Sequence, residues 1–202
     1  MGVPLLFNKC NVFDLIEVQK ENLKQLISGM SLDEVQKPTE EFVPSLVSKF
    51  ARSLPVIEEN KIEVSRQEIQ VDVSRDPTVM AFDGPVYRPG TRITVHIPFS
   101  GVSDWFLVRP STYTLSPPRG EVDDRELRLI FITTDSSAEH VKTEIAKALK
   151  EIKQYLEWLA PAVKQLQSEL TNVATTEIAN RRRYLESQSN MISSLGFPER
   201  KS

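Results

Sequence analysis

The sequence predicts an α+β fold, with a small antiparallel β-sheet or sandwich, N-terminal helices, and a long C-terminal helix or helical hairpin. The prolines give the first observation, because seven of the 13 lie between Pro77 and Pro118, which is typical of a middle rich in turns. The second is the apolar spacing, which alternates in that middle part and recurs every three or four residues elsewhere. We therefore divide the chain into a helical segment 1–58, a β core 59–135 and a helical segment 136–202.

The segment 1–58 carries two helix patterns. Asn11 can cap a helix whose apolar face starts at Val12, and Gly29 is a natural end for it. A second helix is expected to start at Thr39, and Pro55 ends the segment. Both patterns predict amphipathic helices.

Four runs in the segment 59–135 predict strands: Ile69–Val73, Ile93–Ile97, Trp105–Val108 and Leu127–Ile132. The connections between them are short, so neighbouring strands must be antiparallel, since a parallel crossover needs about a dozen residues or more. Six aromatic residues are expected to form the core of this sheet rather than a ligand groove: Phe82, Tyr87, Phe99, Trp105, Phe106 and Tyr113.

The segment 136–202 contains the most regular pattern in the chain. Ser136 and Glu139 form a candidate capping box at its start. Nine apolar residues then alternate at spacings of four and three, which is a heptad pattern and predicts a packing seam: Ile145, Leu149, Ile152, Leu156, Leu159, Val163, Leu166, Leu170 and Val173. We expect this interaction seam to belong to the core of the chain's own fold, with any dimer built around it.

The length of this pattern leaves two arrangements open. One helix over residues 138–194 would be about 85 Å long at about 1.5 Å per residue, so it either protrudes as a coiled coil or folds back as a hairpin. A reversal would fall at Thr171-Asn172 or Thr175-Thr176. Pro161 lies opposite the seam, where a kink is expected rather than a break.

No constellation of residues points to catalysis. His96 and His140 have no second histidine or cysteine at ligand spacing, and nothing beside Cys10 indicates a thiol enzyme. Glu151 and Lys153 have the Glu-x-Lys spacing of restriction-type nucleases but lie on the heptad helix. Glycine-rich phosphate loops and the Gly-x-Ser-x-Gly motif are absent. We therefore expect a protein that is not an enzyme and holds no metal or other cofactor.

Composition narrows the location and the partners. The sequence contains no run of 18 apolar residues, which a helix would need to span a bilayer. The N-terminus does not resemble a secretory signal, and the single cysteine cannot form an internal disulfide. We therefore expect a cytoplasmic protein with no membrane partner. The net charge of −3 gives no overall attraction for nucleic acid.

One local charge feature could still bind nucleic acid. Arg181, Arg182 and Arg183 form a basic run late in the C-terminal pattern, where they can contact phosphates. The same run could instead complement the helix dipole from a solvated face. Nucleic acid is therefore a candidate partner, with these three arginines as the binding residues.

Several stretches together resemble a known family. They are VDVSRDP from Val71, PFSG from Pro98, RPSTYTLSPPRGEV from Arg109, QYLEW from Gln154 and RRRYLESQSNMISSLGFP from Arg181. In this order they resemble the N-terminal portion of a family of uncharacterised prokaryotic proteins that carry a C-terminal restriction-endonuclease-like domain. The resemblance covers most of residues 55–198, and the sequence stops where the nuclease portion would begin. We therefore expect a truncated or split member, to which no catalytic residue carries over.

Two functional hypotheses follow. The first is a non-catalytic interaction and oligomerisation module, which pairs with itself and positions or regulates a nuclease-like domain or protein. The resemblance, not the residues alone, implies a role in nucleic-acid processing or prokaryotic anti-phage defence. The alternative is a nucleic-acid-binding module that uses Arg181–Arg183.

Overall fold

The computed structural model describes residues 3–51, 53–79, 84–134 and 138–195, and it divides the chain into two compact units. Unit 1 consists of Met1–Asn11 and Leu54–Leu159, and unit 2 of Val12–Ser53 and Ala160–Ser202. The 57-residue helix α4 (Ala138–Ser194) contributes its first part to unit 1 and its remainder to unit 2. The α+β class is confirmed. The units differ from the three expected segments, because α4 and the first 58 residues are each divided between them.

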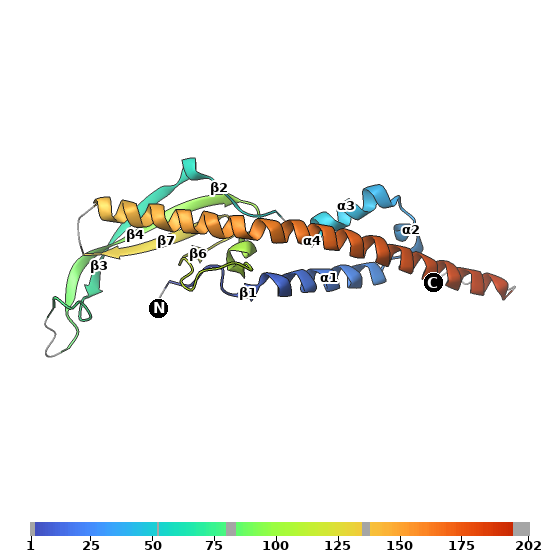
Figure 1. Cartoon of the computed structure of the whole chain (residues 1–202), viewed down its shortest axis with the longest axis horizontal. Coiled ribbons are helices and arrows are strands. Elements are labelled where there is room, and N and C mark those ends of the chain that lie inside the picture. The colour runs from blue at the N-terminus through green and yellow to red at the C-terminus, as the bar shows by residue number, and fades with distance from the viewer. Residues whose placement is uncertain (1–2, 52, 80–83, 135–137, 196–202) are drawn as a thin grey trace. The chain divides into compact units, whose positions relative to one another are not determined.

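Unit 1 is built on a five-stranded antiparallel sheet (Figure 1). Its central strand, β4 (Tyr87–Ser100), pairs on one side with β2 (Val56–Ile57) and β3 (Glu63–Asp72). On its other side β4 pairs with β7 (Glu126–Thr133), which in turn pairs with β6 (Glu121–Val122). The expected strands Ile69–Val73, Ile93–Ile97 and Leu127–Ile132 correspond to parts of β3, β4 and β7.

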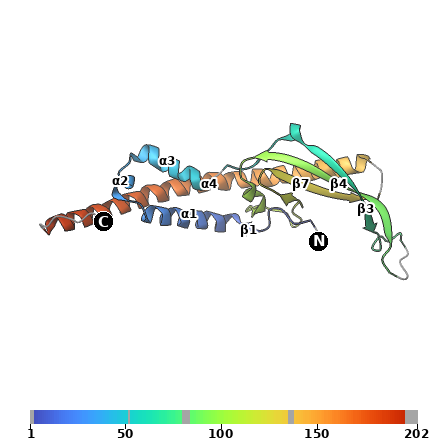
Figure 2. The ribbon, with the colours of Figure 1, turned by 180° about the vertical axis from the view of Figure 1, so that it is seen from behind.

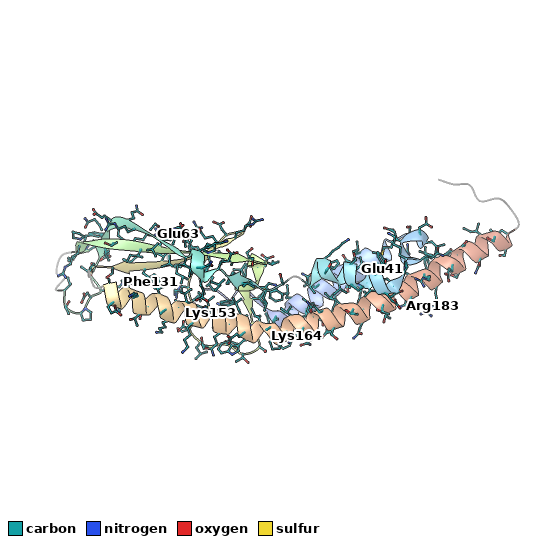
Figure 3. The ribbon with its side chains drawn as sticks, turned by 90° about the horizontal axis from the view of Figure 1, so that it is seen from above. Glu41, Glu63, Phe131, Lys153, Lys164 and Arg183 are labelled. Carbon is teal, nitrogen blue, oxygen red and sulfur yellow. The ribbon has the colours of Figure 1, made fainter. Side chains whose placement is uncertain are left out.

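One face of this sheet forms the core of unit 1 with α4. Val95 and Ile97 of β4 and Leu127 and Leu129 of β7 are buried, and the residues between them are half-buried. This alternation is the period-two pattern of a strand with one covered face. The first part of α4 runs alongside the sheet, and Phe131 lies on the side of β7 that carries these buried residues (Figure 3).

The expectation of a strand over Trp105–Val108 is wrong. Residues Ser103–Leu107 form a 3₁₀ helix, η2, and only Val108–Arg109 form a strand, β5. An apolar run without alternation does not distinguish a buried strand from a buried helical turn, and one turn here buries both Trp105 and Phe106. A second 3₁₀ helix, η1, spans Glu59–Lys61.

The strand β5 pairs in parallel with β1 (Cys10–Asn11), which brings the start of the chain into unit 1. The rule that short connections impose antiparallel pairing does not apply to these strands, because almost a hundred residues separate them. Of the six aromatic residues expected in the core, Phe99, Trp105 and Phe106 are buried. Tyr87 and Tyr113 are exposed, and Phe82 lies outside the described residues.

Unit 2 packs three shorter helices around the remainder of α4 (Figure 2). They are α1 (Val12–Ser28), α2 (Leu32–Val35) and α3 (Thr39–Phe50). The starts of α1 and α3 agree with the sequence prediction. The short helix α2 was not predicted. At its start, the Glu34 carboxylate accepts hydrogen bonds from the backbone N–H and the hydroxyl of Ser31, both at 2.9 Å. These bonds hold the pKa of Glu34 below its usual value.

The helix α4 is continuous, so the hairpin alternative is wrong. At the expected reversals, Thr171 and Thr175 each donate a side-chain hydrogen bond to the carbonyl four residues earlier, at 2.8 Å, within the helix. Pro161 is exposed, and the helix continues through it. The helix α4 begins at Ala138. The expected capping residue Ser136 lies outside the described residues. No described helix is long and apolar enough to span a bilayer.

Candidate functional site

The expected interaction seam lies largely inside the chain's own core. Five of its nine residues are buried, Ile152 and Leu159 in unit 1 and Val163, Leu166 and Leu170 in unit 2. The other four are half-buried: Ile145, Leu149, Leu156 and Val173. Most of the seam is therefore occupied by intramolecular packing.

The buried residues of α4 do not all belong to the heptad rows. Tyr155, Ala174 and Ile178 are buried, although none of them belongs to the nine seam residues. Ile152, Val163 and Ala174 follow one another at intervals of 11 residues. An 11-residue repeat corresponds to about 3.67 residues per turn, close to a straight helix, whereas heptads correspond to about 3.5. The covered face therefore drifts around α4 away from Leu156 and Val173.

The basic run Arg181–Arg183 is used mainly within unit 2. Nε of Arg181 donates to the carbonyl oxygen of Met30 at 3.0 Å, just beyond the end of α1. Nε of Arg182 donates to the carbonyl of Val35, the last residue of α2, at 3.0 Å. A cation is favourable at such helix ends, where carbonyls lack helical partners. Arg183 is exposed and donates to the side chain of Asn180 at 2.6 Å.

Three polar side chains on neighbouring strands form a hydrogen-bonded chain that sequence reasoning missed. Nε2 of His96 lies 2.8 Å from the hydroxyl oxygen of Ser65, and Nδ1 of His96 lies 3.2 Å from a carboxylate oxygen of Glu126. These residues come from β4, β3 and β7. Their order matches the nucleophile, base and orienting acid of hydrolytic triads. Ser65 and Glu126 are 61 residues apart in the sequence, so only the strand register reveals the contact.

In the described residues, the sheet around these three side chains offers them no oxyanion hole. Ser65, His96 and Glu126 lie on the sheet face opposite the covered one, with 29 % of the His96 side chain exposed. Strand N–H groups point along the plane of the sheet and not toward that face, so they form no oxyanion hole there. We therefore assign these three residues to cross-strand pairing on the open face.

The loop between β5 and β6 is fixed to the body of unit 1 at several points. The hydroxyl of Tyr155, on α4, accepts the backbone N–H of Thr114 at 2.9 Å and lies 2.9 Å from the Thr114 hydroxyl oxygen. The ring of Tyr155 stacks on Phe7 with centroids 4.7 Å apart, so the tyrosine itself is held in place. The far end of the loop binds the N-terminal segment. The backbone N–H of Leu6 donates to the carbonyl oxygen of Pro118 at 2.8 Å, and the backbone N–H of Gly120 donates to the carbonyl oxygen of Pro4 at 3.0 Å.

The same loop exposes apolar side chains to solvent. Leu115 follows the anchored Thr114 and is 99 % exposed, and Tyr113 is 50 % exposed. The guanidinium of Arg109 lies 5.1 Å from the centre of the Tyr113 ring, within cation–π range. We call Tyr113 and Leu115 the loop tip. No sequence pattern singles out Leu115, and Tyr113 was expected in the core of the sheet.

Among the remaining predicted features, Lys153 forms an ion pair with Glu59 at 2.7 Å and is therefore part of a surface contact in unit 1. Cys10 is exposed in β1, and His140 is exposed on the first turns of α4. Among the residues that the structure describes, no group of three or more His, Cys, Asp or Glu side chains could hold a metal ion.

No family model, curated protein or solved structure matches the chain. The candidate site therefore rests on the geometry of the loop tip and on the surfaces that the core leaves open.

Proposed function

We propose that the chain is a non-catalytic interaction and oligomerisation module. It contacts a protein partner through the loop tip, and it also associates with a second copy of itself. The observation that carries the proposal is that Leu115 is almost fully exposed, although hydrogen bonds fix the backbone next to it. A large apolar side chain held out on an anchored loop suits insertion into an apolar pocket of another protein.

The anchoring of the loop favours binding for an entropic reason. Ordering a loop when a complex forms costs binding free energy, and a loop that is already ordered avoids much of that cost. Tyr155 holds the loop at Thr114, and the contacts of Leu6 and Gly120 hold its other end. The partner would therefore meet a preformed surface made of Tyr113, Leu115 and the Arg109 guanidinium.

The identity of the partner is suggested by the sequence resemblance. In that family the corresponding portion precedes a restriction-endonuclease-like domain, so we propose that the partner is a nuclease-like protein or domain that this chain positions or regulates. We place the complex in the cytoplasm and propose a role in anti-phage defence.

The proposal is tested by purifying the tagged chain from cells of its natural source and quantifying the proteins that accompany it. We expect a nuclease-like polypeptide with the wild type and with Leu115→Met, and its loss with Leu115→Asp. Because Leu115 is 99 % exposed, the aspartate variant should unfold at the same denaturant concentration as the wild type. Recovery of the same proteins with Leu115→Asp would contradict the proposal.

Nucleic-acid binding through Arg181–Arg183 is the less favoured proposal. Two of the three guanidinium groups already bind backbone carbonyls, which leaves Arg183 as the exposed cation of the run. Titration with duplex DNA at several salt concentrations distinguishes the two functions, because phosphate contacts release counterions. The slope of the logarithm of the binding constant against the logarithm of the salt concentration becomes shallower by about 0.9 for each lost phosphate contact. If the wild type binds and Arg183→Gln flattens this slope by that amount, the nucleic-acid function is the correct one.

A further inference from the structure

The strand β3 (Glu63–Asp72) is an edge of the sheet in unit 1. It pairs with β4 without interruption from Glu63 opposite His96 to Asp72 opposite Tyr87, and β4 is its only partner strand in the described part of the chain. The ten residues of β3 contain no proline, and most of them are exposed. Figure 3 labels its first residue, Glu63. Such an edge offers unpaired backbone groups to another strand.

Two opposite charges lie near the middle of this edge. Arg66 and Glu68 are two residues apart, so they are on the same face of the strand. Both side chains are exposed, and neither forms an ion pair within the described residues. Gln67 lies between them and faces the other side of the sheet.

This order of charges is complementary to itself. If a second β3 lies antiparallel with Gln67 opposite Gln67, Arg66 of each copy lies opposite Glu68 of the other. The same register places Ser65 opposite Ile69, Val64 opposite Gln70 and Glu63 opposite Val71, so no like charges face each other. Opposite charges at such positions stabilise strand pairing, and like charges destabilise it.

We propose that β3 pairs with β3 of a second copy of this chain, in this register. The pairing extends the two sheets into one across a two-fold axis at Gln67. The occupant is a second copy because the two Arg66–Glu68 pairs form simultaneously only when an identical strand approaches antiparallel, which gives the closed two-fold interface of ordinary homodimers. The inference deepens the self-association within the proposed function, but it uses no residue of the loop tip.

Charge exchange at these two positions tests the proposal. The mass of the full chain is measured by sedimentation velocity over a concentration series at low salt. We expect a wild-type dimer and at least a roughly tenfold weaker dimer for Arg66→Glu and for Glu68→Arg, because each puts two pairs of like charges face to face. The double variant Arg66→Glu/Glu68→Arg restores both pairs and should restore the wild-type dissociation constant. Glu41→Arg, an exposed charge change on α3, is the control that should leave the mass unchanged.

A wild type that remains monomeric to about 100 µM overturns the proposal, as do single variants that dimerise like the wild type. A double variant that does not recover overturns the register. A second measurement does not depend on charge: in a Cys10→Ser background, Gln67→Cys should form a disulfide-linked dimer on mild oxidation faster than Gln70→Cys. Only position 67 lies opposite itself, with the two Cα atoms roughly 4.5–5.5 Å apart, a separation that a disulfide can bridge. Equal rates at the two positions overturn the register as well.

These results are independent of the loop-tip partner. Leu115→Asp should dimerise like the wild type even if it loses its partner protein. If Arg66→Glu loses the dimer and retains the partner, the two interfaces are separate. If the wild type dimerises as proposed but no partner depends on Leu115, the proposed loop-tip function fails while the β3 pairing stands.

Discussion

Arg181 and Arg182 of α4 contact the ends of α1 and α2, and their role in the structure differs from the one that the sequence suggests. In the sequence, Arg181–Arg183 is a basic patch that suits phosphate. In the structure, Arg181 and Arg182 donate to the carbonyls of Met30 and Val35, which a sequence pattern cannot show because about 150 residues separate donor and acceptor. The structure therefore gives these two arginines a structural role in unit 2.

This role predicts unequal effects of three similar substitutions. Arg181→Gln and Arg182→Gln should each lower the free energy of unfolding by about 1–3 kcal/mol, because each removes a hydrogen bond from a charged donor and leaves a carbonyl without it. Arg183→Gln should change it by less than about 0.5 kcal/mol, as is usual for exposed positions. Urea denaturation of the three variants checks this. Equal stabilities for all three would contradict the assigned role.

A second prediction at this scale concerns pH. Gln165 and Lys20 donate hydrogen bonds to the Glu169 carboxylate, and both bonds lower its pKa. The bonds of Lys20 with Glu17 and Glu169, the latter at 3.1 Å, raise the pKa of the lysine above 10.5. The stabilisation from Glu169 is therefore present above the unfolded-state pKa near 4.5 and is lost as the pH falls through the lower folded-state pKa. The stabilisation from Lys20 is present below 10.5 and is lost as the pH rises through its folded-state pKa.

We therefore expect Glu169→Gln to reduce the loss of stability between about pH 5 and pH 3. Denaturant midpoints measured across that range give the comparison. Glu186→Gln, an exposed change near the end of α4, is the matched control and should follow the wild type. An acid transition unchanged by Glu169→Gln would show that this carboxylate does not stabilise the fold.

At the scale of elements, the long apolar pattern predicted helix across residues 138–194, either as one helix or as a hairpin, but not which face would be covered. The heptad count assumed 3.5 residues per turn, whereas the buried residues follow the pitch of a nearly straight helix. Leu156 is therefore half-buried and Leu159 fully buried, although both are seam residues. The drift accumulates with length, so only the structure shows where it places each residue.

This difference gives a prediction for two neighbouring leucines. Leu159→Asp should cost several kcal/mol because it buries an unpaired carboxylate, while Leu156→Asp should cost clearly less because that side chain retains access to water. Denaturant melts of both variants, with Leu159→Met as a volume-conserving control, measure the ranking. If Leu156→Asp is the more damaging change, the heptad seam and not the observed stripe describes the packing of α4.

Other elements show the limits of sequence patterns in the same physical terms. Alternation identified β3 and β4, because a strand with one covered face must alternate, and an apolar run between polar ends identified β7. The run at Trp105 has no alternation, and it forms a 3₁₀ turn. The contact of Tyr155 with Thr114, which anchors the candidate site, joins residues 41 positions apart that carry no shared motif.

For the whole molecule, the proposed role is that of an interaction protein whose long helix supplies the core of both units and leaves two surfaces of unit 1 for partners. The loop tip would contact another protein, and the β3 edge would contact a second copy.

Site-specific photo-crosslinking in living cells tests this division most directly. Benzoylphenylalanine is placed at Leu115, at Gln67 or at the exposed Tyr184 of unit 2, one position per variant. We expect Leu115 to crosslink to a different, nuclease-like protein, Gln67 to crosslink to a second copy of the chain, and Tyr184 to give only background. Crosslinks to nucleic acid at Tyr184, beside the basic run, with none to protein at Leu115 would contradict the proposed function.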